Sequence, residues 1–197
     1  MKDKDKSSDL NVKEAQPSYD AKFTYTDYLQ WDDDVRRELI DGVPYLMAAP
    51  TPRHQEISGN LHGQFYIFLK GKHYKVYHAP VDVRLNSDTF DDTVVQPDLI
   101  IVCDQSIIDD IAIKGVPDMV VEILSPSTSN YDKTTKFCTY MKAGVSEYWV
   151  IDPKNKTLAV HILNAGNYIT HVYQSDETVP VHALEGCIIN LSEIFRE

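Results

Sequence analysis

The chain has 197 residues, of which 43% are hydrophobic and 25% are charged, as expected of one globular domain and not of a wholly disordered chain. Its formal net charge of −11 opposes non-specific attraction to a nucleic-acid backbone unless the positive side chains gather in one patch. The 3 cysteines are widely spaced and form no CxxC pair, which indicates reduced thiols and not a disulfide framework.

Residues 1–20 mix charged and small polar side chains without an apolar period. We expect them to be a disordered tail that precedes a single domain of residues 21–197. The tail contains no apolar stretch of the kind found in secretion signals, and no segment has the long apolar run of a membrane span. These features predict a cytoplasmic protein that does not contact a membrane.

The domain begins with a predicted short helix and a β-hairpin. Residues 26–29 suit a capped helix, and residues 37–40 and 43–47 flank an Asp-Gly turn as two strands. Pro44 lies in the second of these strands and cannot donate to a ladder, so this strand is expected at the edge of a sheet.

A long helix and three extended segments follow the hairpin. Apolar residues recur at helical spacing from Pro52 until Gly71, which ends the run. Residues 74–85, 94–103 and 119–124 are then extended, and the second and third are nearly continuous Val, Ile and Leu, as in strands buried on both faces.

The remaining predicted elements complete an α/β domain. In chain order they are a weakly helical insertion at residues 104–114, a second helix at 132–143, a buried strand at 148–151, a hairpin of residues 157–163 and 168–173, and a tail helix at 191–195. The central order is therefore helix, three strands, helix and strand. We expect one long mixed sheet flanked by helices, with hairpins added before and after it.

Two acidic residues interrupt the apolar segments. Asp98 follows Gln96 and Pro97, and Glu122 lies between valine and isoleucine. An ionised carboxylate in such surroundings costs on the order of several kcal/mol unless it is paired or binds a metal. If the two strands are neighbours, both carboxylates can share one face, and such a pair suits Mg²⁺, with Mn²⁺ as a substitute. The alternative for each acid is an ion pair with lysine or a cap on a neighbouring loop.

Several stretches, taken together and in order, carry a family resemblance. They are Glu38-Leu-Ile-Asp-Gly42, Pro52-Arg-His-Gln-Glu-Ile-Ser-Gly-Asn60, Ala79-Pro-Val-Asp-Val-Arg-Leu85, Val95-Gln-Pro-Asp-Leu99, Pro117-Asp-Met-Val-Val-Glu-Ile-Leu-Ser-Pro-Ser-Thr128, residues 136–140 and Ala143-Gly-Val-Ser-Glu-Tyr-Trp-Val-Ile-Asp-Pro153. Over residues 23–173 the chain resembles the Uma family, restriction-endonuclease-like proteins long catalogued as a domain of unknown function.

The resemblance implies a fold of the PD-(D/E)XK nuclease superfamily, whose core order is the one read above. It also implies that Asp98 is the acid of the PD element and that Glu122 is the acid of the (D/E)XK element. The chain departs from the superfamily pattern two residues later, where Leu124 stands in place of the motif lysine.

The resemblance implies that the lysine has moved to the following helix, as Lys136. Lys136 and Tyr140 are four residues apart and share a helix face, from which the ammonium can turn toward the two acids. Lys133 lies one turn earlier and is an alternative to Lys136. A solvated lysine paired with Asp132 is the non-catalytic interpretation.

Three further residues are weaker candidates. Glu38 matches a family position and is a candidate metal ligand or a contact to one; the alternative is a surface charge paired with arginine. His54, in the first turn of the long helix, is a candidate phosphate contact, because helix amides favour anions there; a helix cap or an exposed histidine is the alternative. Asp82 is a further weak candidate for the site.

These residues predict a Mg²⁺-dependent endonuclease that hydrolyses DNA phosphodiester bonds, with Asp98, Glu122 and the carbonyl of Ile123 on the metal and Lys136 orienting the attacking water. We expect a homodimer.

The alternative function is that of a catalytically silent nuclease-fold module that binds a protein or nucleic acid, and a third possibility is hydrolysis of a non-nucleic phosphoester. A basic strip beside the acids would favour the nuclease; its candidate members are Arg36, Arg53, Lys72, Lys133 and Lys136.

Overall fold

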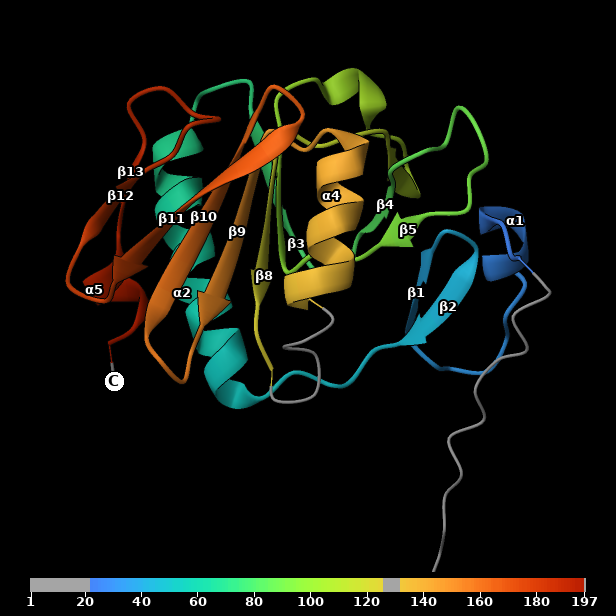
Figure 1. The fold of residues 1–197 in the computed structure, drawn as a ribbon, viewed down its shortest axis with the longest axis horizontal. Helices are drawn as coiled ribbons and strands as arrows, with labels where there is room; N and C mark the ends of the chain where they lie inside the picture. The colour runs from blue at the N-terminus through green and yellow to red at the C-terminus, as the bar shows by residue number, and fades with distance from the viewer. Residues whose placement is uncertain (1–21, 126–131, 197) are drawn as a thin grey trace, which may run out of the picture.

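The computed structural model describes residues 22–125 and 132–196 (Figure 1). The tail predicted for residues 1–20 lies outside these ranges, as does most of residues 125–130, whose Ser-Pro-Ser-Thr-Ser-Asn sequence predicts a turn. Within them, no helix combines the length and the apolar character that crossing a membrane requires.

The N-terminal elements agree with the sequence prediction. Helix α1 (Tyr25–Tyr28) is followed by the hairpin of β1 (Arg37–Ile40) and β2 (Val43–Leu46), and then by the long helix α2 (Pro52–Leu69). The side chain of Thr51 caps α2, because its oxygen accepts a hydrogen bond from the backbone N–H three residues later. The start of α2 is thus fixed by Thr51 and by the proline that follows it.

Each of the first two extended segments is broken into two strands that join different sheets. The first contains β3 (Lys75–His78) and β4 (Asp82–Arg84), and the second contains β5 (Val94–Val95) and β6 (Leu99–Val102). The expectation of two unbroken strands was wrong. Pro97 gives the physical reason in the second segment, because proline has no N–H to continue a ladder.

The rest of the chain alternates strands with short helical stretches. In chain order the elements are η1 (Gln105–Ile107), β7 (Ala112–Lys114), β8 (Met119–Ile123), η2 (Asp132–Lys136), α4 (Phe137–Ala143), β9 (Glu147–Asp152), β10 (Thr157–Asn164), β11 (Asn167–Gln174), β12 (Thr178–Pro180), β13 (Ile188–Asn190) and α5 (Leu191–Ile194). The insertion expected to be weakly helical is only one 3-10 turn followed by strand β7.

The strands form three sheets, where the sequence suggested one long sheet. One sheet has five strands in the order β2-β1-β5-β4-β7, a second has six in the order β11-β10-β9-β8-β6-β3, and β12 pairs with β13. Strand β2 lies at an edge, as Pro44 predicts. Strands β8 and β9 are parallel and the other pairs of the six-stranded sheet are antiparallel, so the domain is a mixed α/β fold. Its central order is α2, then β3, β6 and β8, then α4 and β9, which confirms the predicted order.

The six-stranded sheet is covered on both faces (Figure 1). Helices α2 and α5 and the strands β12 and β13 pack against one face and enclose the largest apolar cluster. Helix α4 and the five-stranded sheet lie against the other face, where a second apolar cluster forms. Strands β6 and β8 are therefore buried on both sides, as their nearly continuous apolar sequences predict.

A buried histidine lies on the α4 side of the sheet. His161 in β10 stacks on Tyr148 at a centroid distance of 5.4 Å, and Phe137 meets it edge-on at 5.0 Å. Its Nδ1 atom lies 2.7 Å from the hydroxyl oxygen of Thr170. Burial lowers the pKa of His161 to about 4.

We expect protein stability to decrease as the pH is lowered from about 6.5 to about 4. The unfolded chain takes up the proton of His161 near its ordinary pKa of about 6.5, whereas the folded chain resists it until about pH 4. The unfolded state binds more protons in this window, so stability is complete above the upper limit and falls by up to about 3 kcal/mol toward the lower one. Urea unfolding at a series of pH values measures the change.

The variant His161→Phe should show a smaller loss of stability over the same pH window. His171→Phe makes the same substitution at an exposed position of β11 and serves as the control. An equal pH dependence in the wild type and in His161→Phe would contradict the prediction.

Candidate active site

The two acids of the apolar segments lie opposite each other across two neighbouring strands. Strands β6 and β8 are antiparallel, and Leu99 pairs with Val121. Extending this register by one residue places Asp98, just before β6, opposite Glu122 in β8. Directly opposed residues of an antiparallel pair project from the same face, and for these two acids it is the face that carries α4.

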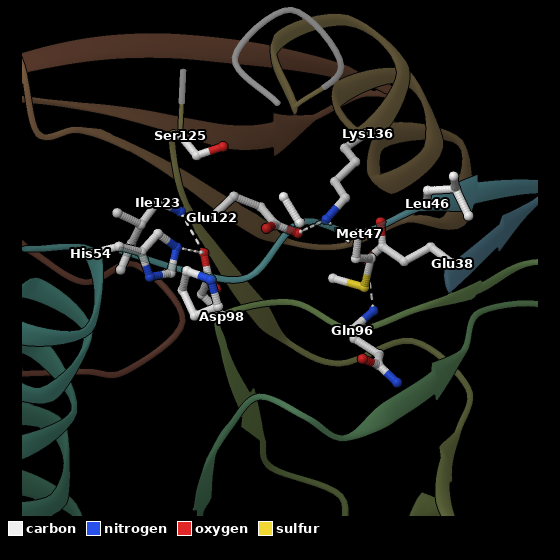
Figure 2. Close-up of a pocket in the computed structure, with 12 residues that line it drawn as sticks. Glu38, Leu46, Met47, His54, Gln96, Asp98, Glu122, Ile123, Ser125 and Lys136 are labelled. Carbon is white, nitrogen blue, oxygen red and sulfur yellow. Dashed lines mark hydrogen bonds and ion pairs between the residues drawn. The ribbon is translucent and has the colours of Figure 1, made fainter. Parts of the chain in front are cut away.

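Asp98 is held through one of its two carboxylate oxygens. Its Oδ2 atom accepts a hydrogen bond from the backbone N–H of Ile123 at 2.8 Å and lies 3.1 Å from Nε2 of His54 (Figure 2). The Oδ1 atom accepts no hydrogen bond from any residue in the described ranges. One oxygen therefore anchors the carboxylate, and the other remains available at the pocket that Asp98 lines.

Lys136 joins two glutamates from different sheets. Its ammonium lies 2.8 Å from Oε1 of Glu122 in β8 and 3.0 Å from Oε1 of Glu38 in β1. The three residues are 3%, 4% and 1% exposed, respectively, so this ion cluster is almost completely buried. A buried charge is tolerated only when it is paired, which explains why the lysine and the two acids converge here. Lys136 ends the π-helical turn η2, a type of turn often found at functional sites.

Two neutral groups also contact the glutamates. The hydroxyl group of Tyr140, one turn after Lys136, donates to Oε1 of Glu122 at 2.7 Å. The backbone N–H of Gln96 donates to Oε1 of Glu38 at 2.8 Å. Burial, followed by the charges of the two glutamates, raises the pKa of Tyr140 well above its usual value, so this hydroxyl stays protonated and acts as a donor.

His54 is buried beside Asp98. Burial opposes a positive charge on its ring, but the hydrogen bond and the negative charge of Asp98 outweigh burial and raise the pKa of His54. Its Nδ1 atom has no hydrogen-bond partner and is the only buried side-chain nitrogen or oxygen in the described part of the chain with none. The interpretations of His54 as a helix cap or an exposed histidine are wrong, because Thr51 caps α2 and the ring is only 8% exposed.

These side chains share one small cavity. Its volume is about 70 Å³, which holds a cation and a few water molecules but not a nucleotide. Among the described residues, the lining includes the carboxylates of Glu38, Asp98 and Glu122 and a single ammonium, that of Lys136, so two formal negative charges remain from these groups when all four are ionised and His54 is neutral. Much of the remaining wall is apolar and comes from the end of β2 and the segment that follows it, including Leu46 and Met47, which Figure 2 labels.

The family model Uma2, described as "Putative restriction endonuclease", matches residues 25–192. The chain belongs to the Uma2 family. The resemblance predicted from the sequence motifs is thereby confirmed.

Two relatives of this Uma2 chain extend along nearly its whole length. An uncharacterised protein from Synechocystis is 25% identical over 180 residues, which are 89% of this chain and 92% of the relative. A crystal structure from Anabaena variabilis, described as "a putative nuclease belonging to DUF820", is similar with a TM-score of 0.72 at 21% identity, and the match covers 88% of this chain and 97% of that chain. The restriction-endonuclease-like fold class is therefore shared with a solved structure.

The departure of this Uma2 chain from the superfamily motif has a structural counterpart. Leu124 is buried in the apolar cluster on the α4 side of the sheet. The ammonium near Glu122 comes instead from Lys136, at the junction of η2 and α4. The backbone of Lys133 forms part of η2, but its side chain is outside the described part of the structure.

The other sequence candidates lie away from the cavity. Asp82 starts β4 and does not line the pocket; its carboxylate accepts hydrogen bonds from the hydroxyls of Tyr25 and Tyr28 and from the side chain of Gln96. Asp82 is connected to the pocket through Gln96. The backbone N–H of Gln96 donates to Glu38, and the side-chain amide of Gln96 donates to Asp82. Asp82 therefore lies outside the pocket, and a role for it at the site stays a prediction.

Among its members with described side chains, the basic strip considered from the sequence does not gather beside the acids, although Arg36 donates a hydrogen bond to the side chain of Gln96, which lines the pocket. Arg53 pairs with Glu56 at 2.7 Å and donates to the carbonyl oxygens of Phe195 and Arg196. Lys72 follows the far end of α2, whose last residue Leu69 lies about 22 Å along the helix axis from His54, and its ammonium lies over the ring of Phe68. Only Lys136 of the strip's described side chains lines the pocket.

Sequence reasoning missed the roles of two residues at the site. Tyr140 was placed on the same helix face as Lys136 but received no function, although its four-residue spacing was the signal. Gln96 was noted only as a neighbour of Asp98. Neither its backbone bond to Glu38 nor its side-chain bond to Asp82 follows from the sequence, because both partners come from other strands.

Proposed function

We propose that this protein is a divalent-metal-dependent endonuclease that hydrolyses DNA phosphodiester bonds. The observation that carries the proposal is the convergence, in one cavity, of Asp98, Glu122 and the buried ammonium of Lys136. Membership of the Uma2 family, described as "Putative restriction endonuclease", supports the same reaction class.

The donor set suits a hard divalent cation. Mg²⁺ prefers oxygen ligands, keeps several waters and often uses only one or two carboxylates. In the described residues no group of three or more His, Cys, Asp or Glu side chains is arranged to hold a metal, but Asp98, Glu122 and the carbonyl of Ile123 match the smaller requirement of Mg²⁺. The oxygen of Asp98 without a donor and the excess of two negative charges also fit a dication. Such an ion would polarise the phosphoryl group and acidify water.

The residues around this set have distinct proposed tasks. Lys136 would orient the attacking water and offset negative charge that develops on the phosphoryl oxygens. Glu38 holds the ammonium of Lys136 in place from β1, and Tyr140 holds Glu122 from α4. Because these contacts are buried, the charged groups would need little rearrangement when the substrate arrives.

We also propose that a homodimer cleaves duplex DNA. One cavity per chain provides one set of acids, whereas cutting both strands of a duplex uses two. Two-fold pairing is the commonest symmetry of soluble oligomers. Sedimentation measures whether the protein is a dimer. The ratio of linear to nicked plasmid measures whether both strands are cut.

Titration with Mg²⁺ and Mn²⁺ by calorimetry, combined with a supercoiled-plasmid nicking assay, tests the proposed function. We expect the wild type to bind both ions, and nicking to stop in a chelator and to return when metal is added in excess. The double variant Asp98→Ala/Glu122→Ala should lose both activities. Metal binding by the wild type without cleavage of plasmid or single-stranded DNA would contradict the endonuclease, and no metal binding would reject the metal site.

One observation favours a second candidate, a catalytically silent interaction module. Among the described positive side chains only Lys136 lines the cavity, and the net charge of the chain is −11. A protein partner with a basic surface would then be better suited to this face than DNA. Retention of metal-independent partner binding in the double variant would support this candidate.

A further inference from the structure

We propose that His54 is a positioning residue that fixes the carboxylate of Asp98 for metal binding. The inference rests on the proposed function and adds to it a residue that touches neither the metal nor the substrate. Its basis is the contact between Nε2 of His54 and Oδ2 of Asp98 at 3.1 Å in the wall of the cavity.

Asp98 requires such a residue because its carboxylate can rotate. The last torsion of aspartate is broad and roughly two-fold, so a single hydrogen bond does not fix the plane of the group. The backbone N–H of Ile123 supplies one donor, from β8. His54 supplies a second one, from the first turn of α2, to the same oxygen. With two donors from two elements on Oδ2, Oδ1 is the oxygen left for a ligand.

The burial of His54 supports this role. A carboxylate oxygen only accepts hydrogen bonds, so Nε2 carries the proton, and in the neutral ring Nδ1 is then an acceptor. This Nδ1 atom is buried and has no partner. A buried polar atom without a partner destabilises a fold, and an apolar side chain would avoid that cost. The contact with Asp98 is the function that explains why a histidine, and not an apolar residue, occupies this position.

Helix capping does not account for His54. Its backbone N–H is bonded to the side chain of Thr51, which is the N-cap of α2, and its ring takes no part in that bond. The ring can therefore be replaced without removing the cap. A substitution of His54 therefore tests the effect on Asp98 without disturbing the start of α2.

Three variants test the role of His54. His54→Leu removes the donor at similar volume, His54→Gln keeps an amide donor of comparable reach, and His62→Leu makes the first substitution two turns later on α2, outside the cavity. We expect Mn²⁺ binding, measured by calorimetry, to weaken about 10- to 100-fold in His54→Leu, the usual effect of losing a group that orients a metal ligand. His54→Gln should recover most of the affinity, and His62→Leu should match the wild type.

A second measurement uses the metal-free protein. Hydrogen exchange of the Ile123 amide reports on its bond to Asp98, and the exchange should be faster in His54→Leu than in the wild type and in His54→Gln. If the wild type binds no Mn²⁺, the proposed function fails, and the exchange rates alone decide whether His54 orients Asp98. If the wild type binds Mn²⁺ and both His54 variants bind it equally well, or if both lose affinity equally, the positioning role is overturned while the proposed function stands.

Discussion

The variant Asp98→Asn should lose Mn²⁺ binding and plasmid nicking while keeping its fold. The carbonyl oxygen of asparagine can replace Oδ2 and accept the hydrogen bond from the N–H of Ile123. The amide nitrogen then occupies the place of Oδ1, so a donor replaces the acceptor offered to the metal and one negative charge disappears. We expect affinity to fall by more than about a hundredfold, because removing a group that only orients a ligand already costs about 10- to 100-fold.

Asp118→Asn is the matched control for this prediction. Asp118 lies just before β8, at the opposite end of the strand from Glu122, and its carboxylate accepts a hydrogen bond from the backbone N–H of Cys103. The control should bind Mn²⁺ and nick plasmid like the wild type. Calorimetry and the nicking assay measure function, and thermal unfolding in a chelator measures the fold. Unchanged Mn²⁺ affinity in Asp98→Asn would remove this residue from the metal site.

Lys136→Met should destabilise the protein by about 3–5 kcal/mol, the range found when one partner of a buried ion pair is removed. The substitution keeps most of the side-chain volume but leaves Glu38 and Glu122 without the ammonium that neutralises them. The free energy of unfolding, from urea titration at neutral pH, measures the loss. Nicking should also be lost, because the proposed role of Lys136 requires its charge.

The double variant Lys136→Met/Glu38→Gln separates the two effects. Removing one negative charge from the pair of glutamates should restore part of the stability, whereas nicking should remain absent. Lys142→Met, at an exposed position in the last turn of α4, is the control and should alter neither stability nor nicking. A stable Lys136→Met protein with wild-type nicking would show that the ammonium is dispensable for both.

Most helices and the later strands could be predicted from local sequence. The long apolar period of α2, the glycine that ends α4 and the hairpin of β10 and β11 are each encoded by neighbouring residues. The division of residues 74–85 and 94–103 between two sheets could not be predicted in this way. It depends on which distant strands accept each half, and an apolar strand sequence is compatible with either sheet.

The site was predictable to different degrees. The acids Asp98 and Glu122 interrupt apolar segments, so their sequence surroundings draw attention to them directly. The choice of Lys136 over Lys133 relied on the family resemblance, because helical spacing allows both. The contact of His54 with Asp98 could not be anticipated, since it depends on how the start of α2 packs against the end of a strand.

The cluster of Glu38, Lys136 and Glu122 has a mechanical consequence. Glu38 belongs to the five-stranded sheet, Glu122 to the six-stranded sheet, and Lys136 to the helical segment that covers both. The cavity therefore lies where the two sheets meet, and its shape depends on how the sheets are aligned. A force or a bound partner that shifts one sheet against the other would change the spacing of the acids without touching them. Substitutions that pack the two sheets more closely and substitutions that change the reaction would then affect the same three side chains.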